Sequence, residues 1–193
     1  MGMQGDVWAV TTGADADFYV EADTASGAGS FTLANTKPEY NGVGYQVTIT
    51  SSGDDTGVTF TVTGNAMDGQ TRSEDITGVN AATATSTTYF TEVSSVAVDG
   101  ATDGDITVGY GGNMALPKTR IKNLYYVASA SAGSVVVTQN STSRVLLNVP
   151  TPASATVTDG ILVPGNGIST AFTPDDYATV VLTNVTSANF ICG

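Results

Sequence analysis

The sequence of 193 residues contains no histidine and a single cysteine, Cys192. Histidine is the most common general base and metal ligand in enzymes. Its absence excludes Ser–His–Asp and Cys–His catalytic arrangements and the familiar catalytic zinc sites. One cysteine also excludes a disulfide framework within the chain. We expect Cys192 to behave as a small apolar residue, because no histidine is present to activate its thiol.

Basic residues are scarce as well: six Lys and Arg stand against 18 Asp and Glu, which gives a net charge of −12. A surface with this charge repels phosphates, so we expect no direct binding to nucleic acid. No apolar run reaches the roughly 20 residues that a membrane-spanning helix needs, and we expect no membrane association. Residues Met1–Asp6 have neither the basic start nor the apolar core of a secretory signal peptide, so we expect none.

The abundant residues are those that favour β-structure. Threonine occurs 31 times and glycine 22 times, whereas the residues that fill surface helices are few. Apolar and polar residues alternate over Tyr45–Thr50 and Val58–Thr63, which predicts two strands of a hairpin joined by the polar turn Ser51–Gly57. The sequence therefore predicts an all-β, antiparallel fold. Further strands are expected around 72–76, 88–98, 105–110, 119–128, 133–138, 144–149, 156–163, 168–172, 178–184 and 187–192.

Charge divides the chain unevenly. Residues 1–112 hold 15 acidic and two basic residues, and residues 113–193 hold three acidic and four basic ones. We therefore expect two small antiparallel β-sandwich domains, of jelly-roll or Ig-like type, preceded by an extended N-terminal arm. The predicted division is an arm at 1–30, an acidic Thr- and Gly-rich β-sandwich at 31–112, a linker at 113–118 and a C-terminal β-sandwich at 119–193.

Three of the six basic residues, Lys118, Arg120 and Lys122, alternate along one predicted strand and so share one face of a sheet. They form a solvated face, a face that pairs with the acidic half of the same chain, or a docking patch for an acidic neighbour. Tyr126 lies in the same strand and is a candidate contact residue. Trp8, the single tryptophan, is either a core residue or an anchor that inserts into a neighbouring molecule.

Calcium binding is the sharpest alternative to a purely structural role. The segments Asp99–Asp105 and Asp54–Asp55 are rich in the oxygen ligands that calcium prefers, although neither has the spacing of an EF-hand. Asp and Gly also close turns without any metal, and we favour that interpretation. We predict no metal site, no cofactor and no catalytic residues, and hence a protein that is not an enzyme.

Several segments carry a resemblance to a known class of protein. They are Arg120–Tyr126, Ala132–Val137, Pro152–Ser154, Ile161–Ile168 and Tyr177–Thr186. Together they resemble a small β-domain that recurs in virion proteins of tailed bacteriophages. In the first half, Val58–Gly64, Tyr89–Phe90 and Val93–Val98 are similar to Thr- and Gly-rich phage structural modules.

The resemblance implies a non-enzymatic virion structural protein, above all a capsid decoration, or cement, protein. Its partners would be the major capsid protein or other virion proteins, and it would be made in the host cytoplasm and placed on the outer surface of the head. Small domains with apolar strands and no disulfides also lead us to expect a homo-oligomer, most simply a trimer. The alternatives are a neck, tail or fibre component of the same virion, or a carbohydrate-binding adhesive module.

Overall fold

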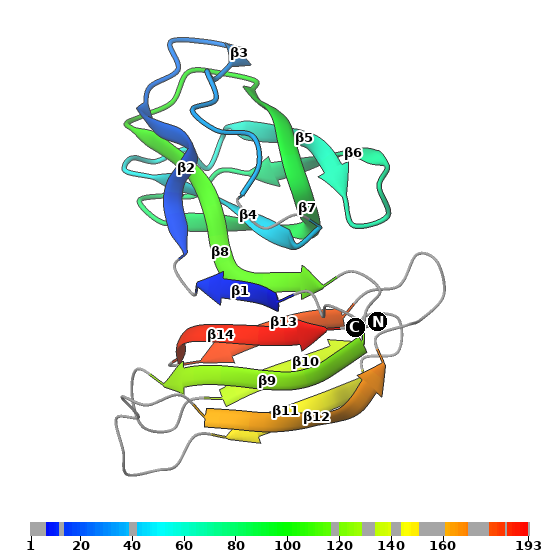
Figure 1. Cartoon of the computed structure of the whole chain (residues 1–193). Coiled ribbons are helices and arrows are strands. Elements are labelled where there is room, and N and C mark those ends of the chain that lie inside the picture. The colour runs from blue at the N-terminus through cyan, green and yellow to red at the C-terminus, as the bar shows by residue number, and fades with distance from the viewer. Residues whose placement is uncertain are drawn as a thin grey trace. The chain divides into compact units, whose positions relative to one another are not determined.

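The computed structural model describes residues 7–11, 14–38, 42–116, 120–128, 134–139, 144–150, 161–169, 178–183 and 185–192. Every regular element in these ranges is a β-strand, and every strand pair is antiparallel (Figure 1). The predicted all-β class is therefore confirmed for this part of the chain, where no helix is long and apolar enough to cross a membrane. The chain separates into two compact units, residues 14–111 and residues 1–13 together with 112–193.

The unit of residues 14–111 is a strongly curved antiparallel sheet, in which neighbouring strands follow the order β2, β8, β4, β7, β5 and β6. A further short strand, β3, pairs with the end of β7. The strands are β2 (Asp15–Asp23), β3 (Gly29–Ser30), β4 (Gly44–Ser51), β5 (Thr59–Ala66), β6 (Thr71–Thr77), β7 (Thr83–Val98) and the first part of β8 (Ile106–Leu116).

The long strand β7 shapes this unit. Its first half, Thr83–Phe90, pairs with β4, and its second half, Phe90–Val98, pairs with β5. Because one strand serves both neighbours, the sheet folds around a common core. The core is formed by the inward-facing apolar residues of this alternating pattern: Tyr19, Val20, Phe31, Val47, Ile49, Phe60, Val62, Ile76, Phe90, Val93, Val96, Val98, Ile106 and Val108.

The predicted hairpin between Tyr45–Thr50 and Val58–Thr63 is wrong. Both strands exist as β4 and β5, but β7 lies between them in the sheet. The tight hairpin joins β5 to β6 instead, where Gly69 adopts a φ of 75° and its N–H donates to the carbonyl of Ala66 at 2.9 Å. A tight turn of this kind holds two strands in register, whereas the longer 52–58 connection does not.

The predicted arm and linker also differ from the structure. Residues 15–30 contribute β2 and β3, and Tyr19 and Val20 of β2 are fully buried. Burial of the apolar triplet Phe18–Val20 is favourable enough that the acidic residues on both sides of it also become part of β2. Residues 113–116 continue β8 as a strand, in which Met114 and Ala115 are buried. They are therefore part of the sheet.

The second unit contains two sets of paired strands. In one set the order is β1 (Val7–Thr11), β14 (Val185–Cys192), β9 (Arg120–Ala128) and β12 (Ile161–Ser169). In the other set the end of β8 pairs with β13 (Ala178–Thr183), then β10 (Ser134–Gln139) and β11 (Arg144–Pro150). The strand β12 runs through residues 164–167, which separate the two strands predicted at 156–163 and 168–172; residues 156–160 and 170–172 lie outside the described part of the chain.

Candidate functional site

Four loops of unit 14–111 are joined to one another by hydrogen bonds. They are residues 24–28, 52–58, 78–82 and 99–105, and we call them the loop end. Backbone hydrogen bonds join neighbouring loops, from Asp55 N to Val79 O at 3.2 Å and from Thr102 N to Ala25 O at 2.9 Å. A side chain at Gly53 would come within 1.3 Å of the Asp103 carbonyl oxygen, so glycine is required there. The loop end is thus a closely packed structure.

Asp55 lies at the centre of the loop end and is completely buried. Its Oδ1 accepts a hydrogen bond from the Asp103 N–H at 2.7 Å, and its Oδ2 accepts one from the hydroxyl of Ser51. An unpaired buried carboxylate is strongly destabilising, whereas a hydrogen-bonded one ties together the groups that donate to it. Asp55 therefore links the 52–58 loop to the 99–105 loop.

Three further carboxylates of the loop end accept hydrogen bonds: that of Asp54 closes a local turn, and those of Asp99 and Asp105 join separate segments. Asp99 Oδ1 accepts the Thr59 N–H at 2.8 Å, and Asp54 Oδ1 accepts the Thr56 hydroxyl at 2.8 Å. Asp105 Oδ1 accepts the Thr24 hydroxyl at 3.1 Å. Within the described ranges, no three or more acidic or cysteine side chains are grouped so as to hold a metal ion. The oxygens of Asp54, Asp99 and Asp105 therefore have hydrogen-bond donors within the unit, and calcium binding stays a matter for experiment.

A second carboxylate with a clear structural role is Glu74, on the terminal strand β6. It lies opposite Val62 in the β5–β6 register, and so shares the inward face with fully buried Val62. Its Oε1 accepts the N–H and the hydroxyl of Thr87 at 2.6 and 3.0 Å, and its Oε2 accepts the Thr88 N–H at 2.8 Å. One carboxylate therefore binds two successive amides of β7.

Those two amides belong to an irregularity in β7. The register with β4 shifts between Gln46 and Thr48, so that Ser86–Thr88 oppose a single residue, Val47. The buried hydroxyl of Ser86 accepts the Val47 N–H at 2.8 Å and donates to the Thr88 carbonyl at 2.8 Å. A bulge leaves backbone groups outside the ladder, and here Ser86 and Glu74 satisfy them from two sides.

The hydrogen bonds to Glu74 also affect its ionisation. Burial alone would raise the pKa of Glu74, but the hydrogen bonds from Thr87 and Thr88 outweigh burial and hold its pKa below the ordinary value of 4.5. The charged form is therefore the one that the bulge stabilises. An inward-pointing charge on a terminal strand also discourages pairing with a strand of another molecule.

The outward face of β5 and β6 carries rows of short polar side chains. Hydrogen bonds join the Thr61 hydroxyl to Asp75 at 2.7 Å and the hydroxyls of Thr63 and Ser73 at 2.8 Å. These pairs follow the strand register, in which Thr61 opposes Asp75 and Thr63 opposes Ser73. The face is consequently rich in hydroxyl groups carried by short side chains.

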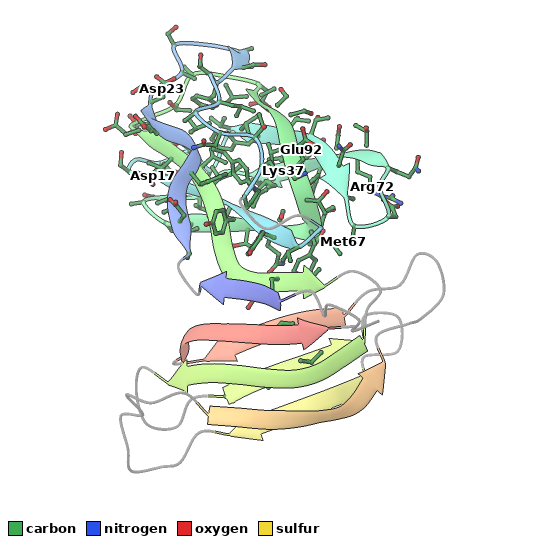
Figure 2. The ribbon with its side chains drawn as sticks, in the orientation of Figure 1. Asp17, Asp23, Lys37, Met67, Arg72 and Glu92 are labelled. Atoms are coloured by element: carbon green, nitrogen blue, oxygen red, sulfur yellow. The ribbon has the colours of Figure 1, made fainter. Side chains whose placement is uncertain are left out.

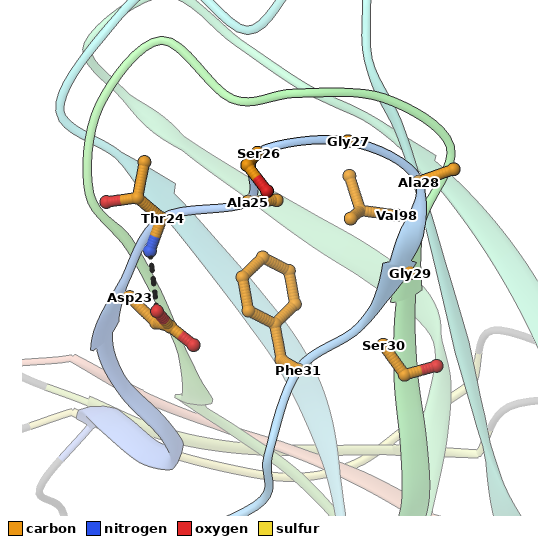
Figure 3. Close-up of a pocket in the computed structure, with 10 residues that line it drawn as sticks. All are labelled: Asp23, Thr24, Ala25, Ser26, Gly27, Ala28, Gly29, Ser30, Phe31 and Val98. Carbon is orange, nitrogen blue, oxygen red and sulfur yellow. Dashed lines mark hydrogen bonds between the residues drawn. The ribbon is translucent and has the colours of Figure 1, made fainter.

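Two pockets lie at the end of β2, and both include Asp23 in their walls. The first, of about 240 Å³, is open to solvent and is lined by Asp23–Ser30 together with Phe31 and Val98 (Figure 3). The second, of about 290 Å³, is lined by Val20–Asp23, Thr32 and Ala34. Each pocket thus combines apolar groups with an exposed carboxylate.

The charge of the chain is concentrated in one unit. Residues 14–111 contain 14 acidic and two basic residues, a balance of −12, whereas residues 1–13 with 112–193 contain four of each. Asp17 and Asp23 lie along β2, on the opposite side of the unit from Arg72, which forms an ion pair with Asp68 (Figure 2). Burial, and after it the neighbouring carboxyl group of Asp17, raise the pKa of Asp15 above its ordinary value.

The residues predicted as partner contacts all fall in the other unit. Trp8 lies in β1, opposite Phe190 of β14 in the same chain. Arg120 and Tyr126 lie in β9 with Lys122 between them, and they oppose Ser169 and Ile161 of β12. Lys118 and the side chains of these four residues lie outside the described part of the chain. Their roles as contacts remain predictions.

Glu74 was not singled out in the sequence, and Asp55 was considered only as part of a calcium-binding or turn-closing segment, not as a buried link between loops. A signal for Glu74 was present, because Arg72, Glu74 and Ile76 alternate along one strand and the last of them is apolar. A glutamate on the face of a core isoleucine needs donors from another strand. No comparable signal marks Asp55, which has the local sequence of an ordinary exposed turn. Comparisons with family models, with curated proteins and with solved structures found no match to this chain.

Proposed function

We propose that the chain is a non-enzymatic virion structural protein of a tailed bacteriophage, most specifically a decoration protein of the capsid surface. The separation of charge between the two units supports this proposal, because a neutral unit suits contacts between copies of the chain and an acidic unit suits contacts with a basic partner. The neutral unit contains the apolar runs Val135–Val137 and Val180–Leu182, which pair with each other in β10 and β13. The acidic unit carries the entire net charge of −12.

Copies of the acidic unit repel one another, so self-association is most favourable through the neutral unit. The acidic unit is then available for a partner with a basic surface, since complementary charge favours encounter and orientation. The carboxylates and hydroxyls of this unit fasten its loops and strands, as Asp55 and Glu74 do. A rigid acidic unit of this kind suits repeated attachment to a regular lattice better than it suits catalysis.

The test is to fractionate particles from the natural source on a density gradient and to locate the chain on them by electron microscopy with a specific antibody. A decoration protein is expected at regularly repeated positions over the head. Labelling confined to the neck, tail or fibres would assign the chain to that part of the virion instead. Particles without the chain would refute a role in the virion.

Sedimentation of the purified chain tests whether the neutral unit mediates self-association while the acidic unit binds the partner. At micromolar concentration we expect a symmetric oligomer, most simply a trimer, that persists in 1 M salt because apolar burial is little affected by screening. Attachment to particles should weaken in the same salt. A monomer both in solution and on the particle would contradict the proposed assembly.

A further inference from the structure

We propose that the two pockets beside Asp23 accept lysine or arginine side chains from an extended basic segment of a partner protein. The inference rests on the proposed function, since it assigns the surface through which the acidic unit would meet its partner. Both pockets lie at the end of β2, and Asp23 forms a wall of each. One partner segment that passes Asp23 can therefore reach both pockets.

The lining of each pocket matches the two parts of a basic side chain. Lysine and arginine have apolar stems that pack on apolar surface and charged ends that remain near water or an opposite charge. In the first pocket the stem would lie against Phe31 and Val98, and the charged end would lie near the carboxylate of Asp23. In the second, the exposed side chains of Ala22 and Ala34 offer the apolar contact, and Glu21 and Asp23 offer the charge.

The surrounding charge selects the same occupant. The unit has 14 acidic residues and only two basic ones, Lys37 and Arg72. Arg72 is paired with Asp68 at the β5–β6 hairpin, and Lys37 is a wall residue of neither pocket. A neutral or acidic segment would gain nothing from this field, whereas a basic one is attracted to it.

The shape of the first pocket adds a reason for a long, narrow side chain. The loop Ala25–Gly29 curves around the opening above Phe31, and the Asp23 carboxylate accepts the Thr24 N–H at 2.8 Å (Figure 3). This bond fixes the direction of the carboxylate at the rim. A volume of about 240 Å³ is large enough for one flexible side chain.

The experiment uses the full-length chain labelled with ¹⁵N and a defined probe, N-acetyl-hexalysine amide, titrated in low salt. Amide shifts are expected to be largest at residues 20–34 and 98. Binding constants are then measured by fluorescence anisotropy for the wild type, for Asp23→Asn and for the matched control Asp54→Asn. Asp54 is an exposed carboxylate of the loop end and lines neither pocket, so each variant removes one negative charge from the same unit.

We expect Asp23→Asn to raise the dissociation constant for hexalysine by about threefold or more, and Asp54→Asn to raise it by less than half that factor. A direct ion pair with a carboxylate contributes more to binding than the attraction of a distant charge does. Equal weakening, or shifts spread evenly over all acidic residues, would show general attraction and overturn the proposal. The wild-type shift map decides the question even if Asp23→Asn folds poorly. If the chain decorates particles but Asp23→Asn attaches normally, the pocket assignment fails while the proposed function stands.

Discussion

Replacing Glu74 by glutamine tests whether one carboxylate holds the β7 bulge in place. The change keeps the size and shape of the side chain but removes the charge and turns one acceptor into a donor. That donor would face the N–H of Thr87 or Thr88, which now approach the carboxylate at 2.6 and 2.8 Å. Hydrogen bonds to a charged partner contribute about 1.5–3 kcal/mol, and the loss of several that share one group is not additive.

We therefore expect Glu74→Gln to lower the free energy of unfolding by about 2 kcal/mol at pH 7. In urea, with a slope of about 2 kcal/mol per molar, this corresponds to a fall in the unfolding midpoint of about 1 M. The measurement is equilibrium unfolding followed by far-ultraviolet circular dichroism. The matched control is Glu92→Gln, because Glu92 makes a single long contact at 3.3 Å with Asn65 and should change stability by less than about 0.5 kcal/mol.

The pH dependence gives an independent check. The pKa of Glu74 is lower in the folded protein than its ordinary value of 4.5, so the folded state binds fewer protons at this group. Its contribution to stability is complete above pH 4.5 and disappears as the pH falls through the lower, folded value. The difference in stability between wild type and Glu74→Gln should therefore shrink below pH 4.5. Equal effects of the Glu74 and Glu92 variants, or a difference independent of pH, would refute the role of Glu74 in holding the β7 bulge.

Four further predictions follow from the described contacts. Tyr19→Phe should raise the free energy of unfolding by about 1 kcal/mol, because the Tyr19 hydroxyl is buried and has no hydrogen-bond partner among the described residues; a loss of stability in a urea titration would show that the hydroxyl is satisfied. Asp55→Ala should lower it by about 3 kcal/mol, because the Asp103 N–H and the Ser51 hydroxyl lose their acceptor, and calorimetry showing a change below about 1 kcal/mol would contradict this. EDTA should shift the melting temperature by less than about 2 °C, and a larger shift reversed by calcium would restore the calcium interpretation. Residues 14–111 expressed alone should unfold cooperatively with a β-type spectrum, whereas a non-cooperative melt would show that this unit needs the rest of the chain.

Strand positions were largely predictable, because alternation of apolar and polar residues determines which face of a strand is buried. The segments around Tyr45–Thr50, Val58–Thr63 and Val93–Val98 are strands for this reason. Pairing between strands was not predictable in the same way. A period of two specifies a buried face but not a neighbour, and β4 is therefore separated from β5 by a strand that follows both in the sequence.

The site was less predictable than the fold. An aspartate in a polar turn has the same local sequence whether it is exposed, as Asp54 is, or buried, as Asp55 is. The difference arises from the N–H of Asp103, which is 48 residues away along the chain. Similarly, the acidic stretch around Phe18–Val20 resembles a solvated arm until β8 is available to pair with it. Such features depend on contacts between distant segments, which no local pattern records.

The pairing of β1 with β14 has a consequence for how the protein is made. Val7 lies opposite Ile191, so β1 cannot pair with β14 until that part of the chain has been synthesised. All strands of unit 14–111 leave the ribosome in between, and that unit can fold while β1 has no partner. Contacts this distant in sequence form slowly. Truncation before Val185 would therefore leave β1 unpaired and exposed to association with other chains, while the acidic unit would retain every one of its own strands.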